Sequence, residues 1–486
     1  MPKGIGKLRS LQTLTMFVVG QKNSGYGIRE LELRNLLGGK LEIHDLEYVE
    51  NKNDAEGANL KLKPNLYRLE LNWSKDCDKD GKDLLEGLQP HINVKILSVK
   101  YYRGVSFPKW MMRSSSLPNM VEISLRHCNK CEHLPALGQL PSLKVLKVLE
   151  MKAVKALGRE FYTDGTLSGA ERVTPAFPSL RIFILVNLPN LEKWLEPESV
   201  SFSCLENLSI ENCPKLTSLP TEFPSLQEIR LLNINSLIVE KLAERTLTSL
   251  TYLLIGGCPE LKYLPRRLLQ NNKVLRKLQV RKFPKFQAFR SNNEDPEPVS
   301  TSSLESLEIV GCPLLSDFPD IRGLNSLRSL AISDCENWDS LTVELQCSCT
   351  LEELIIGGFS EKLRSFPFPD VRQLVFLQRL LIKGWSMQTV IPEQLEHFTK
   401  LKELTISDFP DLVSLPNSLG NLESLQILEI KSCKVLMSLP SKEIMSRLRA
   451  LKKLRIIDCP RLKDRCSKNT GDEWYKVAHI LDLLYD

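Results

Sequence analysis

The 486-residue sequence contains no apolar run long enough to span a membrane, since its longest continuous candidate covers only residues 182–186. No apolar stretch follows residues 1–4 to form a signal peptide. The 65 Lys and Arg residues and 59 Asp and Glu residues give a net charge of +6, with no basic block. These absences argue against a membrane-spanning, secreted or nucleic-acid-binding protein. We interpret 182–186 as a buried strand.

Catalytic patterns are also missing. The six histidines are scattered, and no G-x-S-x-G sequence marks a hydrolase nucleophile. No other residue pattern names a nucleophile or a general base. The sequence therefore predicts a protein that is not an enzyme and needs no cofactor.

Two short segments resemble metal sites, and both are incomplete. Cys128 and Cys131 have the spacing of a zinc half-site, but no second pair supplies the other ligands. Asp76, Asp78 and Asp80 imitate the start of a calcium-binding loop, yet Gly87 stands where a bidentate Glu is required. We therefore predict no metal site, with Cys128 in a structural role and Asp76 in a solvated loop.

What the sequence does contain is a repeated pattern, L-x-x-L-x-I followed by Cys or Phe. The first leucines of successive units are Leu205, Leu226, Leu250, Leu275, Leu304, Leu327, Leu351, Leu377, Leu401, Leu425 and Leu451. Their spacing of 21 to 29 residues is typical of leucine-rich repeats. Less regular units precede them, from Leu8-Leu11-Leu14 through Leu66-Leu69-Leu71 to Leu180-Phe183-Leu185.

The pattern predicts an α/β leucine-rich-repeat solenoid. Each x-L-x-I core is a short strand whose Leu and Ile point inward, so the stacked strands form a curved parallel sheet on the concave face. Recurrent Leu-Pro or Phe-Pro pairs disfavour long helices on the convex side, which we expect to be irregular or 3₁₀. The Cys after the strand should fill a small buried slot. The 13 cysteines, mostly at such positions, indicate a reduced, cytoplasmic or nuclear compartment.

We divide this single continuous solenoid into three parts. Residues 1–200 are irregular repeats with loop insertions, 201–465 are regular repeats, and 466–486 are a C-terminal cap segment. The loops are expected at 74–87, 162–175 and 291–302, where the period is broken. In the cap, Thr470 and Glu473 fit a capping box for a helix whose apolar stripe is Trp474, Val477, Ala478 and Leu481. That helix is predicted to cover the last coil, with binding of a partner as the alternative.

Several motifs resemble those of a known family. They include residues 2–20, Phe107-Pro108-Lys109-Trp110, the block from Cys128 to Pro141, and the ending with Cys459-Pro460 and Gly471-Asp472-Glu473-Trp474. Together they make the sequence similar to the leucine-rich-repeat region of plant NB-LRR disease-resistance proteins of the coiled-coil class. The resemblance implies a role in innate immunity. The family carries a nucleotide-binding switch domain, but no G-x-x-x-x-G-K-[ST] occurs here. We therefore expect a fragment of a longer receptor or a truncated gene product.

The functional expectation is the recognition and autoregulatory region of an intracellular plant immune receptor. Its partners would be a pathogen effector or a host protein, and the receptor's own nucleotide-binding switch domain. The alternative is a generic protein-interaction scaffold without an immune role. Outward apolar strand residues need a reason, so a protein-binding patch is predicted around Ile355 and Leu381 with the charged Glu353, Arg379 and Lys383. Leu254 and Ile427 are further outward candidates.

Overall fold

The computed structural model describes residues 5–8, 10–21, 26–75, 81–163, 175–196, 201–265, 267–289, 303–316, 324–337, 350–359, 374–386, 388–468 and 470–486. The aspartates at 76, 78 and 80, the segment 291–302 and most of 162–175 lie outside the described residues. Two compact units divide the chain: residues 1–241 with 247–250, and residues 242–246 with 251–486. The three-part subdivision expected from the sequence stays a prediction.

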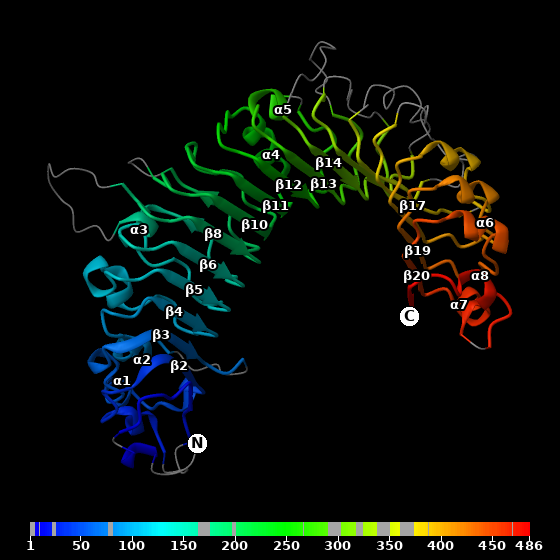
Figure 1. Cartoon of the computed structure of the whole chain (residues 1–486). Helices are drawn as coiled ribbons and strands as arrows, with labels where there is room; N and C mark the ends of the chain where they lie inside the picture. Colours follow the sequence, from blue (N-terminus) through cyan, green and yellow to red (C-terminus); the bar gives the residue numbers. More distant parts are fainter. Residues whose placement is uncertain are drawn as a thin grey trace. The chain divides into compact units, whose positions relative to one another are not determined.

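The first unit is built on parallel strands that lie side by side (Figure 1). They are β1 (Met16–Val18), β2 (Gly38–His44), β3 (Asn65–Asn72), β4 (Ile96–Lys100), β5 (Glu122–Arg126), β6 (Val145–Leu149), β8 (Ile182–Val186), β10 (Asn207–Cys213) and β11 (Glu228–Ile234). A separate small sheet pairs β7 (Ala156–Leu157) with β9 (Lys193–Trp194).

The second unit repeats this construction, with each strand paired in parallel to the next. Its strands are β12 (Tyr252–Gly256), β13 (Lys277–Arg281), β14 (Ser306–Val310), β15 (Ser329–Ser333), β16 (Glu353–Gly357), β17 (Arg379–Lys383), β18 (Glu403–Ser407), β19 (Ile427–Lys431), β20 (Lys453–Ile457) and β21 (Asp482–Tyr485). In either unit, we call the outward side of the strands the sheet face.

Short helices occupy the side opposite the strands in each unit (Figure 1). The α-helices are α1 (Lys52–Glu56), α2 (Lys82–Gly87), α3 (Arg159–Tyr162), α4 (Ser236–Ala243), α5 (Arg267–Asn271), α6 (Lys442–Arg447), α7 (Pro460–Cys466) and α8 (Trp474–Val477). The 3₁₀ turns are η1 (Ile5–Lys7), η2 (Ile28–Leu31), η3 (Leu46–Tyr48), η4 (Leu60–Leu62), η5 (Lys109–Met112), η6 (Ser114–Ser116), η9 (Glu393–His397) and η10 (Asn417–Asn421). This confirms the leucine-rich-repeat solenoid and its short-helical outer side. Helix α2 falls inside 74–87, so that segment is not entirely loop.

Alternation along each strand separates the core from the sheet face. In β14, Leu307 and Ile309 are buried whereas Ser306, Glu308 and Val310 are half-exposed. The same alternation corrects the interpretation of β8 as a fully buried strand. Only Phe183 and Leu185 lie in the core, because the remaining three positions point to the sheet face.

Most of the described coils turn away from the sheet through a residue with positive φ, directly before the buried slot that Cys, Phe or another apolar residue fills. These residues are Tyr101, His127, Glu150, Asn187, Asn212, Asn233, Gly257, Lys282, Gly311, Asp334, Gly358, Asp408, Ser432 and Asp458. The left-handed conformation favours Gly, Asn and Asp, which explains why these types recur there. The three asparagines also bond to one another, with Asn212 Nδ2 donating to Asn187 Oδ1 and Asn233 Nδ2 to Asn212 Oδ1, each at 2.6 Å.

The slot after the turn holds the cysteines as predicted. They are Cys128, Cys213, Cys258, Cys312, Cys335, Cys433 and Cys459, all buried. Each thiol donates to the carbonyl two residues earlier, at 3.2 to 3.8 Å between Sγ and O. Burial raises the pKa of Cys128 to about 12 and that of Cys213 to about 11. These two thiols therefore stay protonated at neutral pH, which fits a structural role.

The expected first unit, Leu8-Leu11-Leu14, has the wrong register. Leu8 is exposed, and Leu11 and Leu14 are only half-buried. The strand is β1, where Phe17 lies in the core opposite Ile43 of β2. Spacing alone failed here because the neighbouring strand fixes the register.

The C-terminal segment also differs from the expectation. Helix α8 has only four residues, no side chain caps its N-terminus, and Leu481 is 89% exposed. The predicted capping box is therefore wrong, and of the predicted apolar stripe only Val477 is buried, while Trp474 is half-buried and Ala478 is exposed. Instead, β21 pairs in parallel with β20 and continues the sheet by one strand.

Candidate protein-binding surface

The residues predicted to bind protein at the centre of the sheet face lie on two adjacent strands. In β16 and β17, Ile355 stands opposite Leu381, and Glu353 stands opposite Arg379. Lys383 ends β17 on the same side. We call these five residues the central patch. Ile355 and Leu381 are both half-buried.

The start of the central patch is fixed by an ion pair. Arg379 Nε lies 3.2 Å from Glu353 Oε1, and Ser329 on β15 donates its hydroxyl to Glu353 Oε2 at 2.7 Å. Burial alone would raise the pKa of Glu353, but the hydrogen bonds from Ser329 and Arg379 outweigh it and hold that pKa below its usual value. The carboxylate therefore stays ionised and its position is defined.

At the other end of the central patch, Lys383 forms an ion pair with a residue two strands away. Lys383 Nζ lies 2.8 Å from Asp334 Oδ1, although Asp334 follows β15, two strands away. The intervening coil passes through Gly357 and Gly358, with φ of +137° and +66°. A Cβ at position 357 would lie 1.8 Å from the Lys383 carbonyl oxygen, and one at 358 would lie 2.5 Å from Asp334 Oδ1. Glycine is therefore required at 357, whereas at 358 it makes room for the Asp334 carboxylate.

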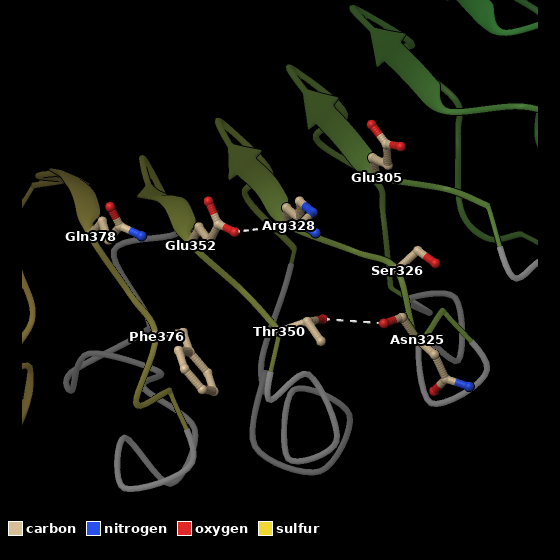
Figure 2. A pocket seen from close by; sticks show the side chains of 8 residues that line it. All are labelled: Glu305, Asn325, Ser326, Arg328, Thr350, Glu352, Phe376 and Gln378. Atoms are coloured by element: carbon tan, nitrogen blue, oxygen red, sulfur yellow. Dashed lines mark hydrogen bonds and ion pairs between the residues drawn. The ribbon is translucent and has the colours of Figure 1, made fainter.

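A groove lies beside the central patch, where β14 to β17 begin (Figure 2). It encloses about 500 Å³ and is lined by Glu305, Asn325, Ser326, Arg328, Thr350, Glu352, Phe376 and Gln378. Four of these residues directly precede a strand, so the repeat places them in one row. The Arg328 guanidinium pairs with the Glu352 carboxylate, and Thr350 donates its hydroxyl to the Leu327 carbonyl at 2.8 Å.

One large apolar side chain, that of Phe376, lines the groove and is exposed. Phe376 is 48% exposed, and Lys400 Nζ lies 4.4 Å from the centre of its ring. An exposed aromatic ring beside charged residues is characteristic of binding surfaces. The sequence interpretation missed this groove, because it considered only positions inside the strands. The row of Glu305, Arg328, Glu352 and Gln378, each one residue before a strand, was the available signal.

The two remaining candidates do not join the central patch. Leu254 on β12 points outward as expected, opposite Gln279, but it is only 7% exposed. Little of this side chain is accessible to a partner, and its role in protein binding stays a prediction. Ile427 is half-buried at the first outward position of β19, opposite Glu403, and β18 separates it from β17.

The described ranges contain neither a metal-ligand cluster nor a membrane-spanning helix. No three His, Cys, Asp or Glu side chains there could hold a metal ion together. Cys131 is buried and donates its thiol to the Gly104 carbonyl at 3.0 Å. No helix among the described residues is long and apolar enough to cross a membrane.

Comparison with family models identifies the repeats. Residues 28–151 match the R13L1/DRL21 leucine-rich repeats. Residues 95–243 and 336–460 match the repeats of plant disease resistance proteins of the RPS2-like type, which is more than half of the chain. The chain belongs to this family. The resemblance seen in the motifs is thereby confirmed.

Individual relatives agree with the family. The disease resistance protein At3g14460 of Arabidopsis thaliana is 30% identical over 94% of this chain and 33% of its own length. The disease resistance protein RGA2 of Solanum bulbocastanum is 34% identical over 54% of this chain and 27% of its own length. The chain thus spans about a third or less of the curated relatives it matches.

Solved structures support the fold. A TLR13 complex with single-stranded RNA has a TM-score of 0.62 at 17% identity, and covers 98% of this chain and 65% of that one. A Toll–Spatzle complex has a TM-score of 0.50 at 14% identity, and covers 92% and 62%. At these identities the likeness concerns the solenoid fold alone.

Proposed function

We propose that this chain is the recognition and autoregulatory region of an intracellular plant immune receptor. It acts in the cytoplasm or the nucleus as a binding region without enzymatic activity. Its sheet face binds a pathogen effector or a host protein, and it also contacts the receptor's own nucleotide-binding switch domain. Membership in the disease-resistance family supports the immune role.

The observation that carries the recognition role is the construction of the central patch. Two apolar side chains, Ile355 and Leu381, stand together on a strand surface that is otherwise mostly polar. The ion pairs of Glu353 with Arg379 and of Lys383 with Asp334 hold the charged rim in place on both sides. An apolar centre with a pre-ordered polar rim is typical of a protein-binding site, because little conformational entropy is lost on binding.

The experiment changes the centre of the patch without touching the core. Ile355→Ser and Leu381→Ser, separately and together, are introduced into the receptor that contains this chain. A cell-death assay with the pathogen present then measures recognition. We expect the double variant to abolish recognition, because buried apolar anchors dominate interface energies. The melting temperature of the purified repeat region should stay unchanged.

Ile457→Ser is the matched control, since Ile457 is a half-buried outward isoleucine on β20, away from the patch. It should leave recognition intact. Retained recognition in the Ile355 and Leu381 double variant would refute a contact at the central patch. A separate binding assay between the repeat region and the nucleotide-binding domain tests the autoregulatory contact.

A further inference from the structure

The first unit buries two positive charges next to each other. Arg34 follows η2 and is 1% exposed, and Lys63 precedes β3 and is fully buried. Lys63 Nζ donates to the Leu31 carbonyl at 2.8 Å, and the backbone N–H of Arg34 donates to the same carbonyl at 3.1 Å. The Lys63 ammonium and the Arg34 backbone thus meet at one carbonyl, and the positive charge of Arg34 is close enough to act on Lys63.

Neither charge has a negative partner within the part of the chain that the structure describes. Arg34 Nη2 donates to the Ile5 carbonyl at 2.8 Å, but Nε and Nη1 are buried without any acceptor. Two carboxylates of the same coils are bonded to other groups. Glu30 accepts the N–H of Gly6, and Glu70 on the sheet face binds Lys40, Arg68 and Lys100.

Two such cations are costly to bury. An ionised group removed from water loses its hydration, and only pairing or hydrogen bonding compensates for the loss. Burial and the positive charge of Arg34 together lower the pKa of Lys63 to about 8, so proton loss can relieve one charge. Arg34 cannot be relieved in this way, because a guanidinium stays protonated in proteins. It also occupies an inward position three residues from both Leu31 and Leu37, where a leucine would pack.

We propose that Arg34 and Lys63 form a binding site for a small oxyanion of the phosphate or carboxylate class. The anion accepts the unused N–H groups of Arg34 and the charge of Lys63, and thereby stabilises the first coils. Turn η1 covers Arg34 through the Ile5 carbonyl and contains no buried residue. Local opening of this turn therefore gives the anion access at low cost. This site is independent of the sheet face and goes beyond the proposed function.

The experiment is a titration of the full chain with inorganic phosphate, and separately with acetate, at constant ionic strength maintained with chloride. Calorimetry and thermal melts follow binding. We expect a saturable heat and a rise in melting temperature with at least one of the two anions. The anion that binds more tightly identifies the class. Arg34→Met and Lys63→Met should each weaken binding at least about tenfold, because each removes a charged hydrogen-bond donor.

Lys61→Met is the matched control, because Lys61 lies on η4 beside Lys63 but is exposed. It should bind the anion as the unmodified chain does. Arg34→Met is expected to fold, since it removes an uncompensated buried charge. Phosphorus NMR of the phosphate adds a readout that needs no unfolding: its resonance should broaden with the unmodified chain and not with Arg34→Met. The absence of saturable binding of both anions, or equal binding by Arg34→Met and Lys61→Met, would overturn the proposal.

Discussion

Buried charge is handled differently in the C-terminal cap and in the first coils. In the cap, Glu473 is 4% exposed and its carboxylate lies 3.0 Å from Lys476 Nζ and 3.3 Å from Arg465 Nη2. Its other oxygen accepts the Leu439 N–H at 3.0 Å, and Lys476 donates to the Leu439 carbonyl at 2.9 Å. Each of these charged groups has a partner.

In the first coils, Arg34 and Lys63 are as deeply buried, but their acceptors are backbone carbonyls. The comparison teaches that the buried Lys476 of the cap has a carboxylate beside it, which also binds the half-exposed Arg465, whereas the two buried cations of the first coils have no such partner among the described residues. A residue of the family's terminal motif, Glu473, is therefore the element that balances the cap. In the first coils no described carboxylate takes this part, and the anion that we propose would supply the negative charge.

The largest effect is expected from removing the carboxylate of the cap. Glu473→Ala leaves Lys476 buried without its ion pair and the Leu439 N–H without an acceptor. Breaking a buried pair from one side costs about 3–5 kcal/mol of unfolding free energy. Urea unfolding of the purified chain measures it. If the unfolding free energy fell by less than an ordinary surface substitution causes, the carboxylate would not be what stabilises the buried charge of the cap.

The core should be packed equally closely in the two regions. Replacing one equivalent buried leucine in each region tests this. Leu69 on β3 and Leu454 on β20 are both fully buried inward strand residues. Leu69→Ala and Leu454→Ala should each cost about 2–5 kcal/mol, because each leaves a cavity in a close-packed coil. Thermal and urea unfolding should show similar losses. A much smaller loss at Leu69 would mean that the first coils are loosely packed, so that their buried cations need no counterion.

These two regions also show how far the sequence predicts the fold. The period of 21 to 29 residues predicted the repeats, because inward leucines share one core from coil to coil. It failed at β1, where pairing with β2 puts Phe17 rather than Leu14 inside, and at Leu481, where a strand follows instead of a longer helix. In both places the repeat pattern is irregular, so spacing is a weaker guide.

The candidate surface was predictable to a similar extent. Alternation along β16 and β17 correctly put Ile355 and Leu381 outward, and the register places them opposite each other. Alternation could not show that Leu254 is covered, nor that Lys383 reaches Asp334 two strands away. Both facts depend on side-chain lengths in neighbouring coils. The buried charge of Arg34 was likewise hidden, because a sequence pattern does not reveal which polar residue enters a core position.

A smaller effect on the free energy of unfolding is expected from the change in protonation of Lys63 with pH. Its pKa of about 8 lies below the ordinary value of 10.5, so below pH 8 both the folded and the unfolded chain carry the charge and its burial cost is fully present. Between the two values the folded chain loses the proton first, and stability rises with pH. The gain should be about 1–3 kcal/mol. Unfolding in anion-free buffer measures it, taken as the difference from Lys63→Met so that other titrating groups cancel. An identical pH dependence in Lys63→Met would show that Lys63 carries no burial penalty.

The smallest effect on the free energy of unfolding is expected at Asp472, the residue next to Glu473 in the sequence. This carboxylate binds Arg465 through two bonds of 2.9 Å, Nε to Oδ1 and Nη2 to Oδ2, but its side chain is 65% exposed. The hydrogen bond from Arg465 lowers the pKa of Asp472, yet water and salt screen the pair. Asp472→Asn should therefore leave the unfolding free energy unchanged within error, at low and at high salt, while Glu473→Ala destabilises the chain under both conditions. Because the two positions are adjacent in sequence and both contact Arg465, the difference isolates burial as the cause. A comparable loss for both variants would show that the geometry of the ion pair, and not its burial, stabilises the cap.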